Sequence, residues 1–307
     1  MLRAFLRAPS GILGLSALAL ILVFAAIAPV LWGDQARALD IAQAGQNPSP
    51  HHLLGTDSLG RDILSRLLVA TRLSIGLALA ASGLGALIGI PLGAGAVILT
   101  PRLRSVALRT IDTLLAFPGI LIAIFIGAIV GPGPLGAALG VGISVSFSYA
   151  RLTSALAMSV GGREYIAAAR VVGVRPVRLL TRYVLPNIAE TLAIGTTVTV
   201  SSSIVIVSSL SFLGLGVQPP QFDWGRMLTE GVQAFYLTPA AALAPAGAIA
   251  VSALAFGFSG EALARAMNPV LWGAGSRARI PGTLAVPAPT QQEQETPEPE
   301  PSPAGGR

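Results

Sequence analysis

Hydrophobic residues gather into six stretches that carry almost no charge. These stretches run approximately over residues 11–32, 73–99, 111–130, 135–150, 191–217 and 237–258. About 20 helical residues cross a bilayer core of about 30 Å, so most of the stretches are long enough to cross it alone. The fourth is short and is expected to borrow residues 150–160. The pattern predicts an all-α polytopic membrane protein with about six transmembrane helices.

Polar segments divide the chain into predicted regions. The expected order is a cytoplasmic N-terminus at 1–10, a first transmembrane helix at 11–32, an external loop at 33–70, a core of five spans at 71–260 that contains a cytoplasmic loop at 161–187, a cytoplasmic amphipathic segment at 261–274 and a polar tail at 275–307. The tail has too few apolar side chains to offset the entropy of ordering, so we expect it to be disordered.

The first stretch has a second interpretation as a cleaved signal peptide. Arg3 and Arg7 precede it, and Ala26-Ile27-Ala28 resembles a cleavage site. Its apolar run is longer than the 7–15 residues usual in a signal peptide, which favours a span.

Composition and charge support an orientation in the membrane. The chain is 53% hydrophobic and 11% charged, with a net charge of +6 and no cysteine, so a disulfide or a thiolate metal site is excluded. Eleven arginines lie in 1–10, 100–110 and 151–187, against four in the segments between the other span ends. Cationic loops are retained in the cytoplasm during insertion, which predicts that both termini are cytoplasmic. Because the arginines flank apolar spans, we expect contact with membrane lipid and no nucleic-acid partner.

The segment between the fourth and fifth stretches is predicted to form a helix, a turn and a second helix. Gly161-Gly162 interrupts the preceding span, and Glu164 suits the positive end of a new helix. Ala167 to Ala169 favour helix and leave a smooth face. Gly173 can adopt the left-handed conformation that closes a helix, and Pro176 can open the next one.

Leu185-Pro186 is expected to end this second helix. A short rigid helix with an alanine face and arginines around it is suited to docking a soluble protein. The alternative is an ordinary connecting loop whose arginines meet anionic lipid headgroups.

This loop resembles the cytoplasmic loop of the permease subunits of bacterial ATP-binding-cassette (ABC) importers. Their pattern is Glu-Ala-Ala, three residues, Gly, nine residues and Ile-x-Leu-Pro, and the match here is Ala168-Ala169, Gly173 and Leu185-Pro186. Ala167 and Tyr183 replace the Glu and the Ile of the pattern, and Glu164 is a possible substitute for the Glu. The resemblance implies that a set of residues contacts the ATPase: Glu164, Ala168, Ala169, Gly173, Leu185 and Pro186.

Three further segments are similar to the dipeptide, oligopeptide and nickel permeases of this class, in particular to their second-subunit type. They run over residues 54–66, 112–119 and 211–220, the last followed by Trp224-Gly225. The resemblance covers roughly residues 5–272 and implies the type I importer permease fold.

The resemblance also implies a function and a set of partners. We expect a permease subunit of an ATP-driven, binding-protein-dependent importer of di- or oligopeptides that works by alternating access, with nickel or another small solute as the alternative. The implied partners are a second homologous permease subunit, two ATP-binding subunits that carry ATP and Mg²⁺, and an external solute-binding protein. This chain has no Gly-x-x-x-x-Gly-Lys motif, so we expect it to bind no cofactor and not to be an enzyme itself.

A hydroxyl-rich region in the fifth stretch has two interpretations. Nine Ser and Thr residues lie between Thr196 and Ser211. They could line a wet path for the solute, in which case we name Thr199, Ser202 and Ser203 together with Pro118, a residue expected to kink the third span. They could instead bond to their own backbone in closely packed helices, and we favour this second interpretation.

Two alternative functions are weighed against the importer. His51-His52 beside Asp57 and Asp62 suggests a metal site, but no ligand triad has the spacing of one, so we predict no metal. We assign Asp57, Arg61 and Asp62 instead to capping and anchoring the second span.

A secondary transporter usually carries ionisable groups within its spans, and these stretches contain only Asp112, at the edge of the third.

Overall fold

The chain folds into long helices that run side by side. The structure is a computed structural model that describes residues 9–267. The long helices are α2 (Pro9–Leu31), α3 (Ile63–Ile98), α6 (Pro134–Gly161), α9 (Leu185–Phe212) and α11 (Ala240–Met267). The shorter elements are η1 (Ile41–Gln43), α4 (Pro101–Ala116), α5 (Gly119–Val130), α7 (Glu164–Val171), α8 (Pro176–Leu179), η2 (Leu180–Val184) and α10 (Trp224–Gln233). Between residues 9 and 267 the backbone forms no strand, only an isolated bridge of Thr56 with Asp62.

The five long helices are long and apolar enough to cross a membrane. The pair α4 and α5 supplies a sixth crossing if the two form one bent span. The prediction of an all-α protein with about six spans is therefore confirmed. The predicted segments 1–8, within the N-terminal region, and 268–307, with most of the amphipathic segment and all of the tail, lie outside the described residues.

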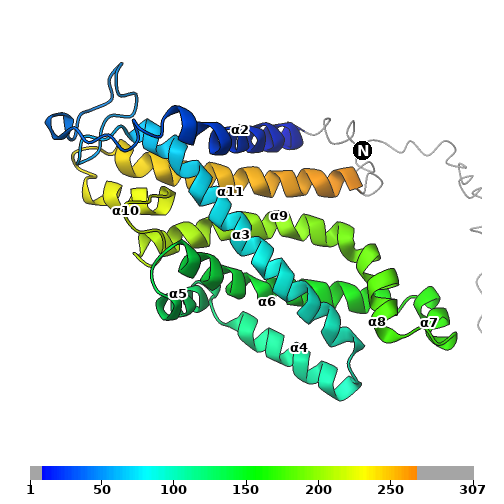
Figure 1. Ribbon diagram of the computed structural model, residues 1–307. Coiled ribbons are helices and arrows are strands. Elements are labelled where there is room, and N and C mark those ends of the chain that lie inside the picture. The colour runs from blue at the N-terminus through cyan, green and yellow to red at the C-terminus, as the bar shows by residue number, and fades with distance from the viewer. Residues whose placement is uncertain (1–8, 268–307) are drawn as a thin grey trace, which may run out of the picture. The chain divides into compact units, whose positions relative to one another are not determined.

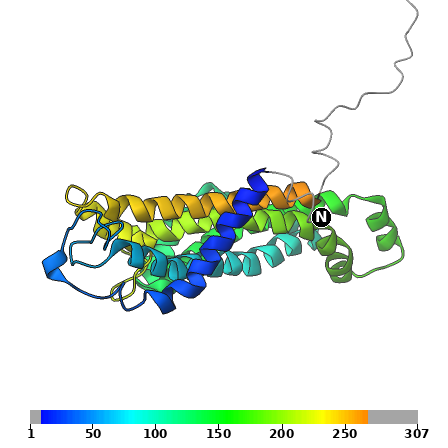
Figure 2. The same cartoon turned by 90° about the horizontal axis from the view of Figure 1, so that it is seen from above.

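The two ends of the bundle carry different elements (Figures 1 and 2). The loop of residues 32–62 and α10 lie at one end, and α7 and α8 lie at the other. The start of α2 and the end of α11 lie toward the end that carries α7 and α8. The first and the last described helices thus begin and end on the same side of the bundle, as expected for an even number of crossings.

The second span begins earlier than the hydropathy pattern predicted. α3 starts at Ile63 instead of residue 73, because Asp62 caps it by accepting a hydrogen bond of 2.8 Å from the Ser65 amide. Its first turns carry Arg66 and Arg72, which lower the local hydropathy and hide the helix start. With 36 residues α3 is about 54 Å long, well beyond the bilayer core.

The third predicted span is broken, not merely kinked. α4 ends at Ala116, α5 begins at Gly119, and the two helices are bent by 88°. Pro118 lacks an amide donor and forces Phe117 into an extended conformation, with φ −76° and ψ 136°. The expected effect of Pro118 is confirmed in kind and is larger than predicted.

α3 and α6 pack closely because glycines remove side chains from their contact. Gly85, Gly89 and Gly93 repeat at every fourth residue of α3 and face α6. A Cβ at Gly89 would overlap the carbonyl oxygen of Ser146, and one at Gly93 would overlap that of Ala150. Small residues at this spacing let membrane helices approach through their backbones.

Replacing Gly89 with valine is expected to lower the stability of the bundle by about 1–3 kcal/mol, because the added atoms overlap the α6 backbone and the Tyr149 Cβ. Thermal unfolding of the purified protein in detergent measures this loss. Gly83→Val is the matched control on the same helix, since a Cβ there meets nothing within 4 Å. Equal melting temperatures for the two variants would contradict this account of α3 packing.

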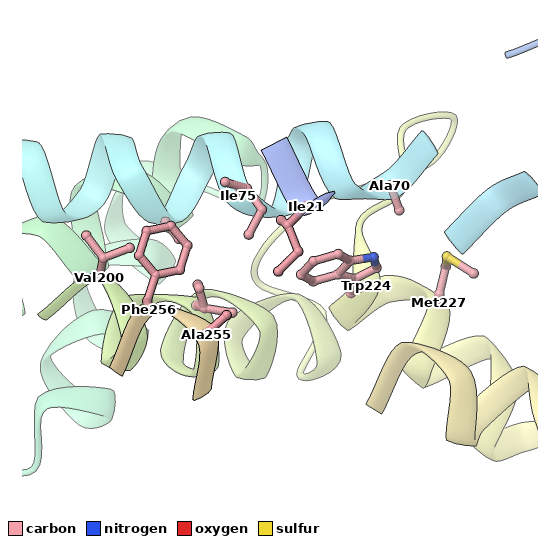
Figure 3. Close-up of a cluster of buried hydrophobic side chains, with 10 residues drawn as sticks. Ile21, Ala70, Ile75, Val200, Trp224, Met227, Ala255 and Phe256 are labelled. Carbon is pink, nitrogen blue, oxygen red and sulfur yellow. The ribbon is translucent and has the colours of Figure 1, made fainter. Parts of the chain in front are cut away.

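Buried apolar side chains form three clusters in the described part of the bundle, two of which bear on the elements at its ends. The cluster drawn in Figure 3 joins α2, α3, α9, α10 and α11 around Trp224 and Phe256. Trp224 also donates to Ser74 Oγ at 2.9 Å from its backbone amide and to the Leu67 carbonyl at 3.0 Å from Nε1. These bonds fix the start of α10 against α3. The second cluster lies under α7 and α8 and is described with the candidate site.

Candidate functional site

The predicted helix, turn and helix of the loop at 161–187 is confirmed. α6 ends at Gly161, and α7 begins at Glu164, which lies in its first turn where the helix dipole favours an acid. Gly173 has φ +82° and donates to the Arg170 carbonyl, while the Val174 amide donates to the Ala169 carbonyl at 3.1 Å. Pro176 then occupies the first turn of α8. The turn therefore depends on a residue that tolerates the left-handed conformation.

The predicted end of the second helix at Leu185-Pro186 is wrong. The chain stays helical through the π-helical turn η2 and enters α9 at Leu185, with Pro186 in the first turn of α9. Proline clashes with the carbonyl four residues earlier in a regular α-helix, and a widened π turn before it relieves that clash. The helical backbone therefore runs without a break from α8 through η2 into α9, the fifth span.

The loop is anchored to the ends of the spans by buried apolar side chains. Ile166 of α7 is 0% exposed, and Leu179 of α8 is also buried. They join a cluster contributed by α3, α6, η2 and α9, whose other members are Ala94, Ala157, Val160, Leu180, Val184, Ile188 and Leu192. Because both short helices are fixed at one face, the loop is held to the spans from which it projects.

The opposite face of the loop is exposed and apolar. Val171 is 89% exposed and Val172 is 83% exposed, and Val177 and Ala168 are also exposed. Arginines surround these residues, namely Arg170, Arg175, Arg178 and Arg182. Glu164 is exposed and makes no ion pair within residues 9–267. We call residues 163–178 the docking knob; the coupling roles of Glu164, Ala168, Ala169, Gly173, Leu185 and Pro186 stay predictions.

The residues named for the solute path lie in different environments. Ser202 is exposed and donates to the Val198 carbonyl at 3.2 Å, and Thr199 is half-buried and donates to the Gly195 carbonyl. Ser203 is fully buried, and its hydroxyl has no hydrogen-bond partner in the described part of the chain. Pro118 is exposed at the break between α4 and α5. Thr199, Ser202 and Ser203 lie within about one turn of α9, and the role of these four residues in a solute path stays a prediction.

Most hydroxyls of α9 bond to backbone, as the packing interpretation predicts. The donors that bond to a carbonyl three or four residues earlier are Thr196, Thr197, Thr199, Ser202 and Ser209. Ser201 donates instead to the Ala253 carbonyl of α11 at 2.6 Å. These hydroxyls find their acceptors on the helix backbone, and the Ser201 bond joins α9 to α11.

A network of buried charges ties α3 to α10 at the other end of the bundle. Asp57 accepts from Arg61 Nε at 2.7 Å and also from Arg66. Glu230 of α10 accepts from Arg61 at 3.0 Å and from Arg66 at 2.9 Å. The predicted anchoring group of Asp57, Arg61 and Asp62 is thus present, and the sequence analysis missed Arg66 and Glu230.

The environment of Asp57 stabilises its charged form. Burial alone would raise the pKa of Asp57, but hydrogen bonds from the backbone amides of Arg61 and Leu59 and the charge of Arg61 outweigh it and hold the pKa below its usual value. Asp223, the N-cap of α10, differs because burial dominates and raises its pKa, in spite of bonds from the Arg226 amide and the Ser211 hydroxyl. One carboxylate therefore anchors arginines, whereas the other caps a helix in a dry environment.

His52 is held by protein groups in the same loop. Its Nδ1 lies 3.0 Å from Asp62 and its Nε2 lies 2.9 Å from Gln43 Oε1. Within the described part of the chain no three His, Asp or Glu side chains are placed to hold a metal ion. His52 thus acts in the hydrogen bonding around the start of α3.

The helices contain more ionisable residues than the apolar stretches suggested. Arg151 of α6 lies 3.2 Å from Asp112 of α4, and both side chains are about half exposed. α6 extends through Gly161, so Arg151 falls within the span although it follows the predicted apolar core. The small number of charges in the apolar stretches therefore does not by itself exclude a secondary transporter. Comparison with known proteins decides between the two classes.

A model of the family described as "Binding-protein-dependent transport system inner membrane component" matches residues 57–271. The chain belongs to this family. It is 36% identical over 238 residues to the glutathione transport system permease protein GsiD of Pectobacterium atrosepticum, covering 78% of this chain and 79% of that one. GsiD of Escherichia coli O157:H7 is 35% identical over 240 residues, with the same coverage. The resemblance to the dipeptide, oligopeptide and nickel permeases is confirmed.

The fold of the permease also matches solved structures. Two chains of the MetNI methionine ABC transporter in inward-facing conformations have TM-scores of 0.54 and 0.55 at 17% and 18% identity. They cover 66% and 65% of this chain, and 95% of each of those chains is covered. The permease therefore has the ABC importer permease fold. Its family and its long apolar helices show that it is a multi-pass inner-membrane protein.

Proposed function

We propose that this permease subunit couples ATP hydrolysis on partner subunits to alternating access for a peptide-like solute. The observation that carries the proposal is the docking knob, whose exposed Val171 and Val172 face away from the bundle while Ile166 is buried in it. Adjacent apolar side chains that are almost fully exposed on a loop outside the spans are typical of a protein contact.

The mechanism requires the knob to move as a stiff unit. Two ATP-binding subunits close on ATP and Mg²⁺, shift the knobs of this chain and of a second homologous permease subunit, and tilt the spans. Buried Ile166 and Leu179 and the continuous helical backbone from α8 through η2 to α9 support this transmission. A loop that flexed freely would absorb the displacement instead of passing it on.

The orientation follows from the same proposal. The docking knob is cytoplasmic, and so are both termini, because the start of α2 and the end of α11 lie toward the knob. The loop of residues 32–62 and α10 face the outside, where an external solute-binding protein delivers the solute. Two relatives are named as glutathione permeases, which supports a di- or tripeptide-like solute over nickel.

ATP hydrolysis is expected only in the assembled importer. The chain purified alone will show no ATPase activity, and it binds no ATP or Mg²⁺, because the machinery lies on the partner subunits. A phosphate-release assay on the lone chain and on the complex with its co-expressed ATP-binding subunits makes the comparison. Turnover by the lone chain at the rate of the complex would contradict the assignment of the chemistry to separate subunits.

The solute is tested by uptake into cells that lack the permease gene and carry it on a plasmid. Labelled glutathione and labelled dialanine are both expected to enter the cells. Each is expected to reduce the uptake of the other, and nickel is expected to reduce the uptake of neither. Uptake of nickel alone would favour the small-solute alternative and leave the coupling mechanism untouched.

A further inference from the structure

A cavity of about 710 Å³ opens at the end of the bundle that carries the loop of residues 32–62. The end of α2, the first turns of α3 and the segment before α10 enclose it. Part of its wall is apolar, with Pro29, Val69, Leu73 and Phe222 among the lining residues. Its volume lies in the range of small-ligand pockets.

The charge that lines this cavity is strongly unbalanced. Four arginines face it, Arg37, Arg61, Arg66 and Arg72, against the single carboxylate of Glu230. Arg37 and Arg72 are exposed and make no ion pair within residues 9–267. Glu230 is already shared by Arg61 and Arg66 at 3.0 and 2.9 Å. The wall therefore presents two guanidinium groups whose charge the described protein does not neutralise.

Arg66 adds an unmatched donor to the same wall. Its side chain is 3% exposed, and its guanidinium lies over the Phe222 ring at 4.7 Å. One terminal nitrogen donates to both Asp57 and Glu230, while the buried Nε has no hydrogen-bond partner among residues 9–267. A buried N–H without an acceptor is costly, so the arginines beside this cavity have more donors than residues 9–267 provide acceptors for.

We propose that this cavity binds the oxyanion of a small molecule, a carboxylate or a phosphate, with Arg37 and Arg72 as its main ligands and the apolar wall in contact with its apolar part. Guanidinium groups form paired, charge-assisted hydrogen bonds with either group. α3 is longer than a bilayer core, so its first turns reach headgroup level. A lipid phosphate and the carboxylate of an arriving solute are both available there.

The test uses the full chain purified in detergent and two probes that separate the sources. Dihexanoyl phosphatidylglycerol supplies a lipid phosphate, and glutathione supplies carboxylates without an acyl chain. Affinities are measured by titration for the wild type, for the double variant Arg37→Gln/Arg72→Gln and for the control Arg102→Gln/Arg109→Gln. The control removes two exposed arginines of α4 that do not line the cavity.

We expect at least one probe to bind the wild type, with an affinity that falls as salt is added. In the Arg37/Arg72 variant we expect the affinity for that probe to fall by about tenfold or more, because two charge-assisted contacts are removed. The control is expected to stay within about twofold of the wild type. Binding of phosphatidylglycerol alone assigns a lipid site, and binding of glutathione alone assigns a solute site.

Failure of both probes to bind, or equal losses in the two double variants, would overturn the proposal. Both altered arginines are exposed, so the variant is expected to melt with the wild type; if it does not, Arg37→Gln alone gives the same comparison. The assay needs no ATPase partner, and its outcome is therefore independent of the coupling proposal.

Discussion

Replacing Gly173 with valine is expected to abolish solute uptake while leaving the permease in the membrane at its normal level. Gly173 has φ +82°, a conformation in which a β-branched residue is strained by about 1–3 kcal/mol. No atom of residues 9–267 lies within 4 Å of the Cβ position, so the substitution acts through the backbone and not through a clash. The turn between α7 and α8 would open and displace Val171 and Val172 from the surface they present.

Uptake of labelled solute and the amount of permease in isolated membranes are the two readouts. Gly162→Val is the matched control in the same loop, because its φ is −86° and a Cβ there meets only ordinary contacts at 3.8 Å or more. Normal uptake by the Gly173 variant would refute the assignment of this turn to the docking knob.

Replacing Asp57 with asparagine is expected to lower the stability of the permease by about 1.5–3 kcal/mol. The change leaves the buried guanidinium of Arg66 with Glu230 as its only remaining carboxylate and weakens the pairing of Arg61. Breaking a buried ion pair by removing one partner is strongly destabilising because the other charge stays buried. Thermal unfolding in detergent measures the loss, with Asp34→Asn as the control at an exposed acid near the start of the same loop.

The pH dependence of unfolding identifies the cause. The pKa of Asp57 is lowered in the folded protein, so its contribution is fully present above the unfolded value of about 3.9 and is lost as the pH falls through the folded value. The wild type is expected to lose stability on acidification, and Asp57→Asn to lose less over the same range. Parallel pH curves for the two proteins would show that the charge of Asp57 is not what stabilises this end of the bundle.

Local backbone chemistry explains why parts of the site were predictable. Gly173 and Pro176 have restricted or special conformations that do not depend on distant residues, so the turn followed from sequence alone. The spans could be predicted from the apolar stretches because crossing a bilayer requires length and hydrophobicity, which are also local properties of the sequence. The start of α3 was missed because Asp62 caps it and polar residues follow before the apolar run.

Contacts between distant residues explain why other parts were not predictable. Arg66 and Glu230 are separated by 164 residues, and only the fold brings α10 against α3. The 88° break at Pro118 depends on how α5 packs as well as on the proline itself. At Leu185-Pro186 a proline indicates a helix end, because its ring clashes with the carbonyl four residues earlier. In this chain the π turn before the proline relieves that clash, and the helix continues.

Disulfide cross-linking tests most directly whether the docking knob couples the spans to an ATPase. The chain has no cysteine, so Ala168→Cys and Val171→Cys each introduce a single reactive thiol on the exposed face, and Asn47→Cys places one on the loop at the other end of the bundle. In the assembled importer, carrying a matching cysteine series on its ATP-binding subunits, we expect both knob variants to form cross-linked products whose yield changes on adding ATP, and the Asn47 variant to form none. Absence of any product from the knob across the whole series would contradict the mechanism.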